Sequence, residues 1–186
     1  SSIEEFNKVN SEYKIVGAIS TGSDYRASKD DSGSELQNEC YKKLKCPILG
    51  LCFGFQSMCK LYGGSIIDSN EYIHKHLKLT NFNQNHFLFS GLDLQGVEFS
   101  FSFHDIIEKV PNGFKQIAML NDIIVGISDE ERKRYGLLFH PEDIEMTYPV
   151  LDNFIGECRS KKESDEQRKI QSGKFEKLLS FKNFTK

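Results

Sequence analysis

The spacing of apolar residues along the chain predicts β-strands that alternate with α-helices. Four short apolar runs are typical of buried strands, and they cover residues 13–19, 47–51, 123–127 and 135–139. Apolar residues then occupy every second position from 97 to 103, which predicts a further strand. The runs at 123–127 and 135–139 are close enough in the chain to form a hairpin.

Helical patterns separate these strands. Apolar residues three to four positions apart predict one helix over residues 34–45, and a second helix over 53–62 ends at Gly63-Gly64. A third helix begins within residues 149–155. Strands that alternate with helices favour a three-layer α/β fold, in which a mostly parallel sheet carries helices on both faces.

Three of the predicted strands end at residues that suit a ligand site. Gly22 lies in a turn after the first strand, Cys52 follows the second, and His140 follows the last. Because ligands of α/β folds bind beyond the carboxyl ends of the strands, we expect these three residues to meet at one edge of the sheet.

Charge and composition narrow the class of protein. The 186 residues include 24 basic and 27 acidic side chains, for a net charge of −3, and five cysteines. This balance argues against a dedicated nucleic-acid binder, and no run approaches the roughly 18 apolar residues of a membrane span. The cysteines are too few for a disulfide scaffold. We therefore expect a cytoplasmic protein that binds neither nucleic acid nor membrane.

The last 26 residues differ from the rest of the chain in charge. Residues 161–186 contain eight basic and four acidic side chains, whereas residues 1–160 carry a net charge of −7. We divide the chain into a domain over 1–160 and a basic amphipathic helix or tail over 161–186. This segment either covers the domain surface or docks on a partner, through a narrow apolar stripe of Ile170, Phe175, Leu178 and Leu179.

The strongest chemical signal is the sequence Gly50-Leu51-Cys52-Phe53-Gly54, which has the spacing of a nucleophile elbow. The sharp turn from strand to helix crowds the neighbours of the nucleophile, so the flanking positions must be small. A helix that begins at Phe53 points its first N–H groups at the sulfur, which favours the thiolate. The Phe53 N–H is also placed to donate to an oxyanion. A buried structural cysteine is the alternative.

A nucleophilic cysteine needs a histidine that acts first as base and then as acid. His140 is the best candidate, because Pro141 fixes the turn after its strand and Glu142 can accept a hydrogen bond from the imidazole. We expect His74, His76 and His86 to be solvated. We expect the other four cysteines to be core residues, namely Cys40, Cys46, Cys59 and Cys158. No cysteine and histidine spacing matches a metal site.

Two long motifs together resemble the class I (triad) glutamine amidotransferases. Residues 47–65 are similar to their nucleophile region, Gly-x-Cys-x-Gly-x-Gln followed by a helix and Gly-Gly, and residues 135–142 resemble their Phe-His-Pro-Glu signature. The stretch 103–114 is most like the amidotransferase part of GMP synthetases. The resemblance covers residues 13–157 and implies a flavodoxin-like α/β fold.

The resemblance implies hydrolysis of glutamine to glutamate and ammonia. Cys52 would attack the side-chain amide and form a γ-glutamyl thioester. His140 would take the thiol proton and later protonate the leaving ammonia, and Glu142 would orient His140.

The same resemblance implies roles for residues around this triad. The N–H groups of Gly22 and Phe53 would form the oxyanion hole, and Gln56 would help to hold the substrate. His104 and Asp105 would contact the amino-acid end of glutamine. Many relatives have Ser-Gly-Gly-Pro where this chain has Ser-Thr-Gly-Ser around Gly22, so one glycine of the loop is retained.

The resemblance also implies parts that this sequence does not supply. A strand and a helix normally precede the strand at 13–19, and we expect them to be missing or another segment to fill the gap. The start at Ser1 fits the remainder of a longer chain. No nucleotide-binding motif is present, so the ammonia would pass to a separate synthetase, and no cofactor is expected. A γ-glutamyl hydrolase and a non-catalytic binding module remain alternatives.

Overall fold

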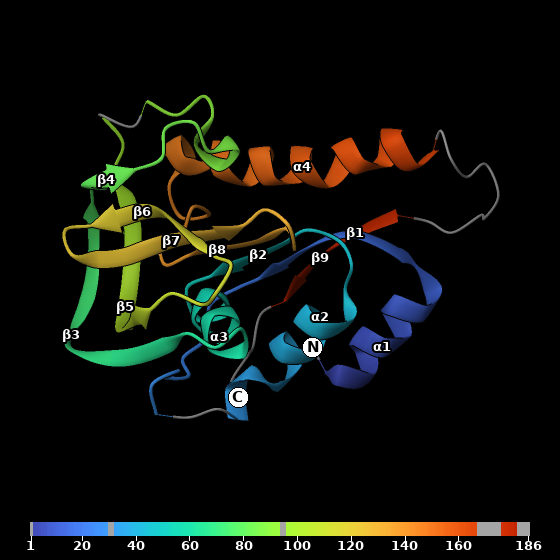
Figure 1. Ribbon diagram of the computed structural model, residues 1–186, viewed down its shortest axis with the longest axis horizontal. Helices are drawn as coiled ribbons and strands as arrows, with labels where there is room; N and C mark the ends of the chain where they lie inside the picture. The colour runs from blue at the N-terminus through green and yellow to red at the C-terminus, as the bar shows by residue number, and fades with distance from the viewer. Residues whose placement is uncertain (1, 30–31, 94–95, 167–175, 182–186) are drawn as a thin grey trace.

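A nine-stranded sheet with helices on both faces organises the part of the chain that the structure describes (Figure 1). The computed structural model describes residues 2–29, 32–93, 96–166 and 176–181. Helix α4 (Pro149–Glu166) lies on one face of the sheet. Three helices lie on the other face, namely α1 (Ile3–Glu12), α2 (Glu35–Lys43) and α3 (Phe53–Leu61). The expected three-layer α/β class is confirmed.

Four strands of the sheet pair in parallel, in the order β8, β2, β1, β9: these are β8 (Arg134–Leu137), β2 (Ile48–Leu51), β1 (Lys14–Ser20) and β9 (Glu176–Phe181). Ser20 pairs with Gly50, and Leu51 pairs with Leu137. Because β1, β2 and β8 run in the same direction, the segments that follow them leave from one edge of the sheet. This register brings Gly22, Cys52 and His140 to that edge.

The other half of the sheet is antiparallel, so the expectation of a mostly parallel sheet holds for those four strands only. The antiparallel strands are β3 (Ser65–Leu77), β4 (Asn81–Phe82), β5 (Phe99–Lys109), β6 (Lys115–Leu120) and β7 (Ile123–Asp129). The predicted hairpin is confirmed, since β7 pairs with β8 in antiparallel fashion. Its short connection allows no crossover helix, and parallel pairing requires one.

Helix α1 precedes β1 and was not predicted from the sequence. The Ser2 hydroxyl accepts a hydrogen bond from the Glu5 N–H (3.2 Å), and the Ser2 N–H donates to the Glu5 carboxylate (2.9 Å). This capping box starts the helix, and Phe6 anchors it in the core at 3% exposure. The Ser-x-x-Glu spacing was the signal that could have revealed α1.

In the C-terminal segment, residues 161–166 continue α4, and residues 176–181 form a strand where we expected a helix or a tail. Helix α4 extends to Glu166, and the backbone of β9 then pairs with β1, with Leu178 opposite Gly17 and Leu179 opposite Ala18. Another segment therefore lies beside β1, as one of our expectations allowed. Without it β1 would be an edge strand with unpaired backbone groups. Ile170 and Phe175 lie outside the described residues.

The core lies between the sheet and the helices that cover it. Its largest buried side chains include those of Phe55 on α3, Phe99 and Phe101 on β5, Phe139 after β8, and Phe154 on α4. None of the described helices is long and apolar enough to cross a membrane.

Arg134 on β8 connects that strand by hydrogen bonds to the segment that enters β2. It is 5% exposed, and its guanidinium donates to the carbonyl oxygens of Leu44 (2.7 Å), Cys46 (2.8 Å) and Tyr41 (3.3 Å). These carbonyls end α2 and lead into β2, so one side chain joins β8 to the start of the strand that carries Cys52.

Replacement of Arg134 by methionine is expected to lower the free energy of unfolding by about 3 kcal/mol, because the buried carbonyls lose their donors. Urea unfolding measures this loss. The matched control is Arg159→Met, at an exposed position of α4, which should change stability by less than about 0.5 kcal/mol. Equal stability of the two variants would contradict the structural role of Arg134.

Candidate active site

Cys52 lies at the turn between β2 and α3 in a strained backbone conformation. Its φ angle is 51°, in the left-handed region that residues other than glycine rarely adopt. Cys52 is the N-cap of α3, and its own side chain makes no capping hydrogen bond. The first N–H groups of a helix have no partner within the helix, so the Phe53 N–H is available near the sulfur. This is the geometry of a nucleophile elbow.

The contacts around the elbow explain both of its glycines. A Cβ atom on Gly50 would lie 2.8 Å from backbone atoms of Gly54 and Phe55. A Cβ atom on Gly54 would lie 2.2 Å from the carbonyl oxygen of Ser20 on β1. Because backbone atoms cannot move away as a flexible side chain can, neither position accepts a larger residue. The predicted reason for the two glycines is therefore confirmed.

His140 and Glu142 form the pair that their spacing suggested. Nδ1 of His140 lies 3.0 Å from Oε1 of Glu142, and the His140 N–H donates to the carbonyl oxygen of Ser100 (2.8 Å), which fixes the residue beside β5. Nε2 of His140 is buried and makes no hydrogen bond with a described residue. The thiol of Cys52 donates instead to the carbonyl oxygen of Ser102 (3.4 Å).

The surroundings of His140 favour its charged form. Burial by itself lowers the pKa of the imidazole, but the interactions with Cys52 and Glu142 outweigh it and raise the pKa to about 10. An imidazolium between two groups that bear or can develop negative charge is stabilised in this way. The site thus favours a charged histidine whenever the sulfur is a thiolate.

Gly22 lies against both members of the cysteine and histidine pair. A Cβ atom at Gly22 would be 3.2 Å from Cε1 of His140 and 3.7 Å from Cβ of Cys52. The loop after β1 therefore lies against both Cys52 and His140, and the three strand ends meet as expected. Only a small residue fits there without displacing His140.

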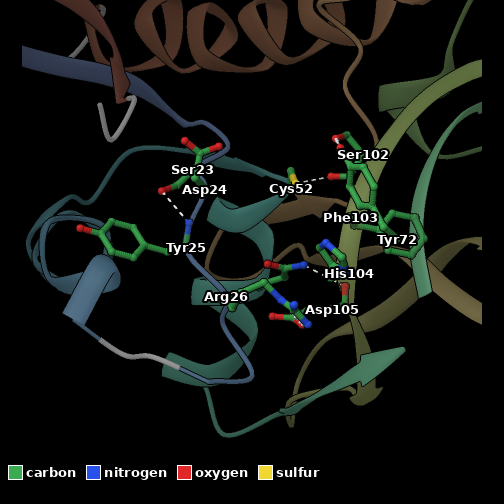
Figure 2. A pocket seen from close by; sticks show the side chains of 11 residues that line it. Ser23, Asp24, Tyr25, Arg26, Cys52, Tyr72, Ser102, Phe103, His104 and Asp105 are labelled. Atoms are coloured by element: carbon green, nitrogen blue, oxygen red, sulfur yellow. Dashed lines mark hydrogen bonds and ion pairs between the residues drawn. The ribbon is translucent and has the colours of Figure 1, made fainter. Parts of the chain in front are cut away.

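A pocket of about 240 Å³ opens beside Cys52 (Figure 2). One wall comes from the loop after β1 and the other from β5, with Tyr72 of β3 at its side. The lining includes four of the predicted site residues, namely Cys52, Gln56, His104 and Asp105, but not His140. The pocket thus gives a small molecule access to the side chain of Cys52.

Asp105 was expected to contact a substrate, but its carboxylate is already bonded within the protein. It is 2% exposed and accepts hydrogen bonds from Arg26 and Ser28 in the loop after β1. Gln56 lines the pocket, yet its amide nitrogen donates to the main-chain oxygen of Asp105 (2.9 Å). His104 stacks on Tyr72, with ring centroids 4.6 Å apart.

The remaining cysteines and His86 do not line this pocket. The four cysteines that we expected in the core are buried: Cys40, Cys46, Cys59 and Cys158. Burial raises the thiol pKa of Cys40, Cys59 and Cys158 to about 12, which keeps these thiols protonated. The expectation of a solvated His86 is wrong, since it is 8% exposed and bonded to Glu130. Burial lowers the pKa of His86.

Seven residues that line the pocket were not among the predicted site residues, and Arg26, Tyr72 and Ser102 are three of them. Arg26 lies in the loop after β1, and Tyr72 and Ser102 lie on paired strands, where the Tyr72 hydroxyl is 2.9 Å from that of Ser102. An exposed aromatic residue within a polar stretch was the only sign of Tyr72. Among the described residues no group of three or more metal-ligating side chains lies together.

Comparison with families of known proteins finds one that matches most of the chain. The model of the family described as glutamine amidotransferase class-I matches residues 13–155. This span includes both motifs and every residue of the site described above.

Individual relatives agree with this match. The glutamine-hydrolyzing GMP synthase of Borrelia garinii subsp. bavariensis is 35% identical over 143 residues, which cover 76% of this chain and 26% of that protein. The pyocyanine-specific anthranilate synthase component 2 of Pseudomonas aeruginosa is 29% identical over 133 residues, which cover 69% of this chain and 64% of that protein. The chain thus spans about a quarter of the length of the GMP synthases that it matches.

A solved structure supports the fold. A protein of Thermoplasma acidophilum described as a GMP synthase subunit superposes with a TM-score of 0.70 at 22% sequence identity. The superposition covers 81% of this chain and 76% of that one.

Proposed function

Because the chain belongs to the class I glutamine amidotransferase family, we propose that it hydrolyses the side-chain amide of glutamine and supplies the ammonia to a synthetase. One observation carries this proposal. Cys52 at a strained elbow, His140 bonded to Glu142, and Gly22 between them meet beside a pocket. This arrangement contains a nucleophile, a base and a group that orients the base.

The proposed reaction begins when the Cys52 proton turns from the Ser102 carbonyl to Nε2 of the neutral His140 ring, which gives the thiolate and imidazolium pair that the raised pKa of His140 favours. The thiolate attacks the amide carbon of glutamine and forms a carbon–sulfur bond. The carbon–nitrogen bond then breaks as His140 returns the proton to the nitrogen, which leaves as ammonia. Water next attacks the γ-glutamyl thioester with His140 as base, which releases glutamate and restores the thiol. Glu142 holds the imidazole in the required orientation.

The residues around the triad have supporting roles in this proposal. The N–H groups of Gly22 and Phe53 stabilise the oxyanion that forms on the amide oxygen. Gln56 and His104 contact the amino-acid end of glutamine from the pocket wall. Gln56 does so through its carbonyl oxygen, because its amide nitrogen already donates to Asp105.

The ammonia acceptor would be a separate synthetase subunit or domain. Similarity to GMP synthases favours a role in GMP synthesis, while the anthranilate synthase component among the relatives keeps a second acceptor class open. We place the enzyme in the cytoplasm, where free cysteines such as these stay reduced.

The test is release of ammonia from glutamine by the purified chain, alone and with candidate synthetases, with γ-glutamyl peptides as the control substrate. Hydrolysis of glutamine, with or without stimulation by a synthetase, is the expected result. Activity on the peptides alone would favour a γ-glutamyl hydrolase. No activity on either substrate under any condition would favour a non-catalytic binding module.

A further inference from the structure

The carboxylate of Asp105 joins the loop after β1 to the centre of β5. Its Oδ1 accepts hydrogen bonds from Nε (2.9 Å) and Nη2 (2.7 Å) of Arg26 and from the hydroxyl of Ser28 (2.8 Å). Its Oδ2 accepts from the Ser28 N–H (2.9 Å). Each carboxylate oxygen offers about two acceptor positions, so the three bonds to Oδ1 saturate that oxygen and the bond to Oδ2 takes one of its two. Asp105 is 2% exposed and thus holds the loop, and a substrate would have to displace Arg26 or Ser28 to reach Oδ1.

The main chain of the same strand segment holds the nucleophile. The carbonyl oxygen of Asp105 accepts from Gln56, which lies one turn after Cys52 on α3 (2.9 Å). The carbonyl oxygen of Ser102 accepts from the Cys52 thiol (3.4 Å). Residues 102–105 therefore contact the elbow through their backbone, while the Asp105 side chain contacts the loop that carries Gly22 (Figure 2).

The charges around Asp105 keep it ionised and bonded. Burial raises the pKa of Asp105, but the bonds from Arg26 and Ser28 outweigh that effect and lower it. Nη2 of Arg26 also lies 3.0 Å from Asp68. Lys60 of α3 adds a second connection to the loop, because its ammonium group donates to the carbonyl oxygen of Ala27 (2.7 Å).

We infer that Asp105 is a positioning residue, which through Arg26 and Ser28 fixes the loop so that the Gly22 N–H faces the carbonyl under attack by Cys52. This inference rests on the proposed glutaminase function. An oxyanion donor acts only when it is held at hydrogen-bond distance from the developing charge. Loss of the carboxylate should therefore slow attack on a carbonyl more than it weakens binding of glutamine.

The first test is Asp105→Asn, which keeps the size of the side chain but replaces one acceptor by a donor. We expect kcat to fall by about 10- to 100-fold, with KM changed by less than about 3-fold. Arg26→Gln, a second variant in case the first does not fold, should act in the same direction. The double variant should lose little more than the worse single variant, because the two residues act as one unit.

Alkylation by iodoacetamide distinguishes a misplaced loop from a damaged Cys52. Iodoacetamide reacts with Cys52 at a saturated carbon, so no oxyanion forms and the loop is not needed. We expect the alkylation rate of Asp105→Asn to stay within about 2-fold of the unmodified protein. Asp122→Asn is the matched control, since Asp122 is an exposed carboxylate in the turn between β6 and β7, and its kcat should stay within about 3-fold.

Three results would overturn the inference. An unchanged kcat would show that the loop needs no such support, and a KM that rises alone would make Asp105 a substrate contact. Alkylation slowed in proportion to kcat would indicate a damaged elbow.

Amide hydrogen exchange tests the same contact without any turnover. Exchange in residues 21–29 should rise at least about tenfold in Asp105→Asn while that of α3 is unchanged, and unchanged exchange in the loop would overturn the inference. An inactive wild-type chain would contradict the proposed function alone, because the exchange experiment would still decide the role of Asp105.

Discussion

Replacement of Cys52 by alanine is expected to abolish hydrolysis of glutamine by this chain. In the proposed mechanism the thioester forms on the sulfur, and alanine offers no nucleophile, so ammonia release should fall by about 10⁴-fold or more. The fold should persist, because the elbow depends on Gly50 and Gly54 and alanine is smaller than cysteine. Ammonia release and thermal unfolding, measured on the same sample, check both statements.

Cys59→Ala is the matched control for this experiment. Cys59 lies on the same helix, is fully buried, and has its thiol pKa raised by burial to about 12. This variant should lose about 1–2 kcal/mol of stability through the lost packing, but it should keep its activity. Unchanged ammonia release from Cys52→Ala would contradict the mechanism.

Replacement of Glu142 by glutamine is expected to lower kcat by about 100-fold or more, because the imidazole loses the carboxylate that orients it and stabilises its charge. The pKa of His140 should fall below its value of about 10, since one of the two interactions that raise it is gone. An NMR titration of the His140 ring measures the pKa, and initial rates at saturating glutamine measure kcat.

The same variant has a defined effect on the pH dependence of stability. A histidine with a raised pKa contributes stability that is fully present below its unfolded pKa of about 6.5. That contribution is lost as the pH rises through about 10, the folded value for His140. In Glu142→Gln the loss should begin at a lower pH in urea unfolding.

Glu145→Gln is the control for both effects, because Glu145 is an exposed carboxylate three residues further along. It should leave the His140 titration and kcat unchanged. A His140 pKa that is the same in Glu142→Gln and in the unmodified protein would refute the role of Glu142.

Features that depend on neighbouring residues were predictable from the sequence. The elbow at Cys52 requires small residues on both sides of one turn, and Gly50 and Gly54 stand there because backbone atoms approach within 3 Å. The pairing of His140 with Glu142 spans two residues and needs only the turn at Pro141. The capping box of helix α1 also involves only residues close in the chain, so α1 was predictable from the sequence as well.

Features that depend on distant partners were not predictable. Asp105 was chosen for a substrate contact, but its partner Arg26 lies 79 positions away in the chain and has no distinguishing neighbours. Burial of His86 follows from the packing of its ring against Tyr135, with centroids 6.0 Å apart. The strand β9 forms because β1 offers an edge to pair with, whereas charge and spacing alone favoured a helix.

The sequence by itself thus determined the class of fold and the residues of the proposed triad, because strand and helix periods and the residues of a tight turn are set by local sterics and hydrogen bonding. The tertiary structure alone decided how the sheet divides into parallel and antiparallel halves. It also decided that Asp105 braces a loop and that a C-terminal strand lies beside β1. These outcomes depend on which buried charged groups and which strand edges the fold brings together. A buried carboxylate must be paired, and its partner is the cationic side chain that the fold places beside it.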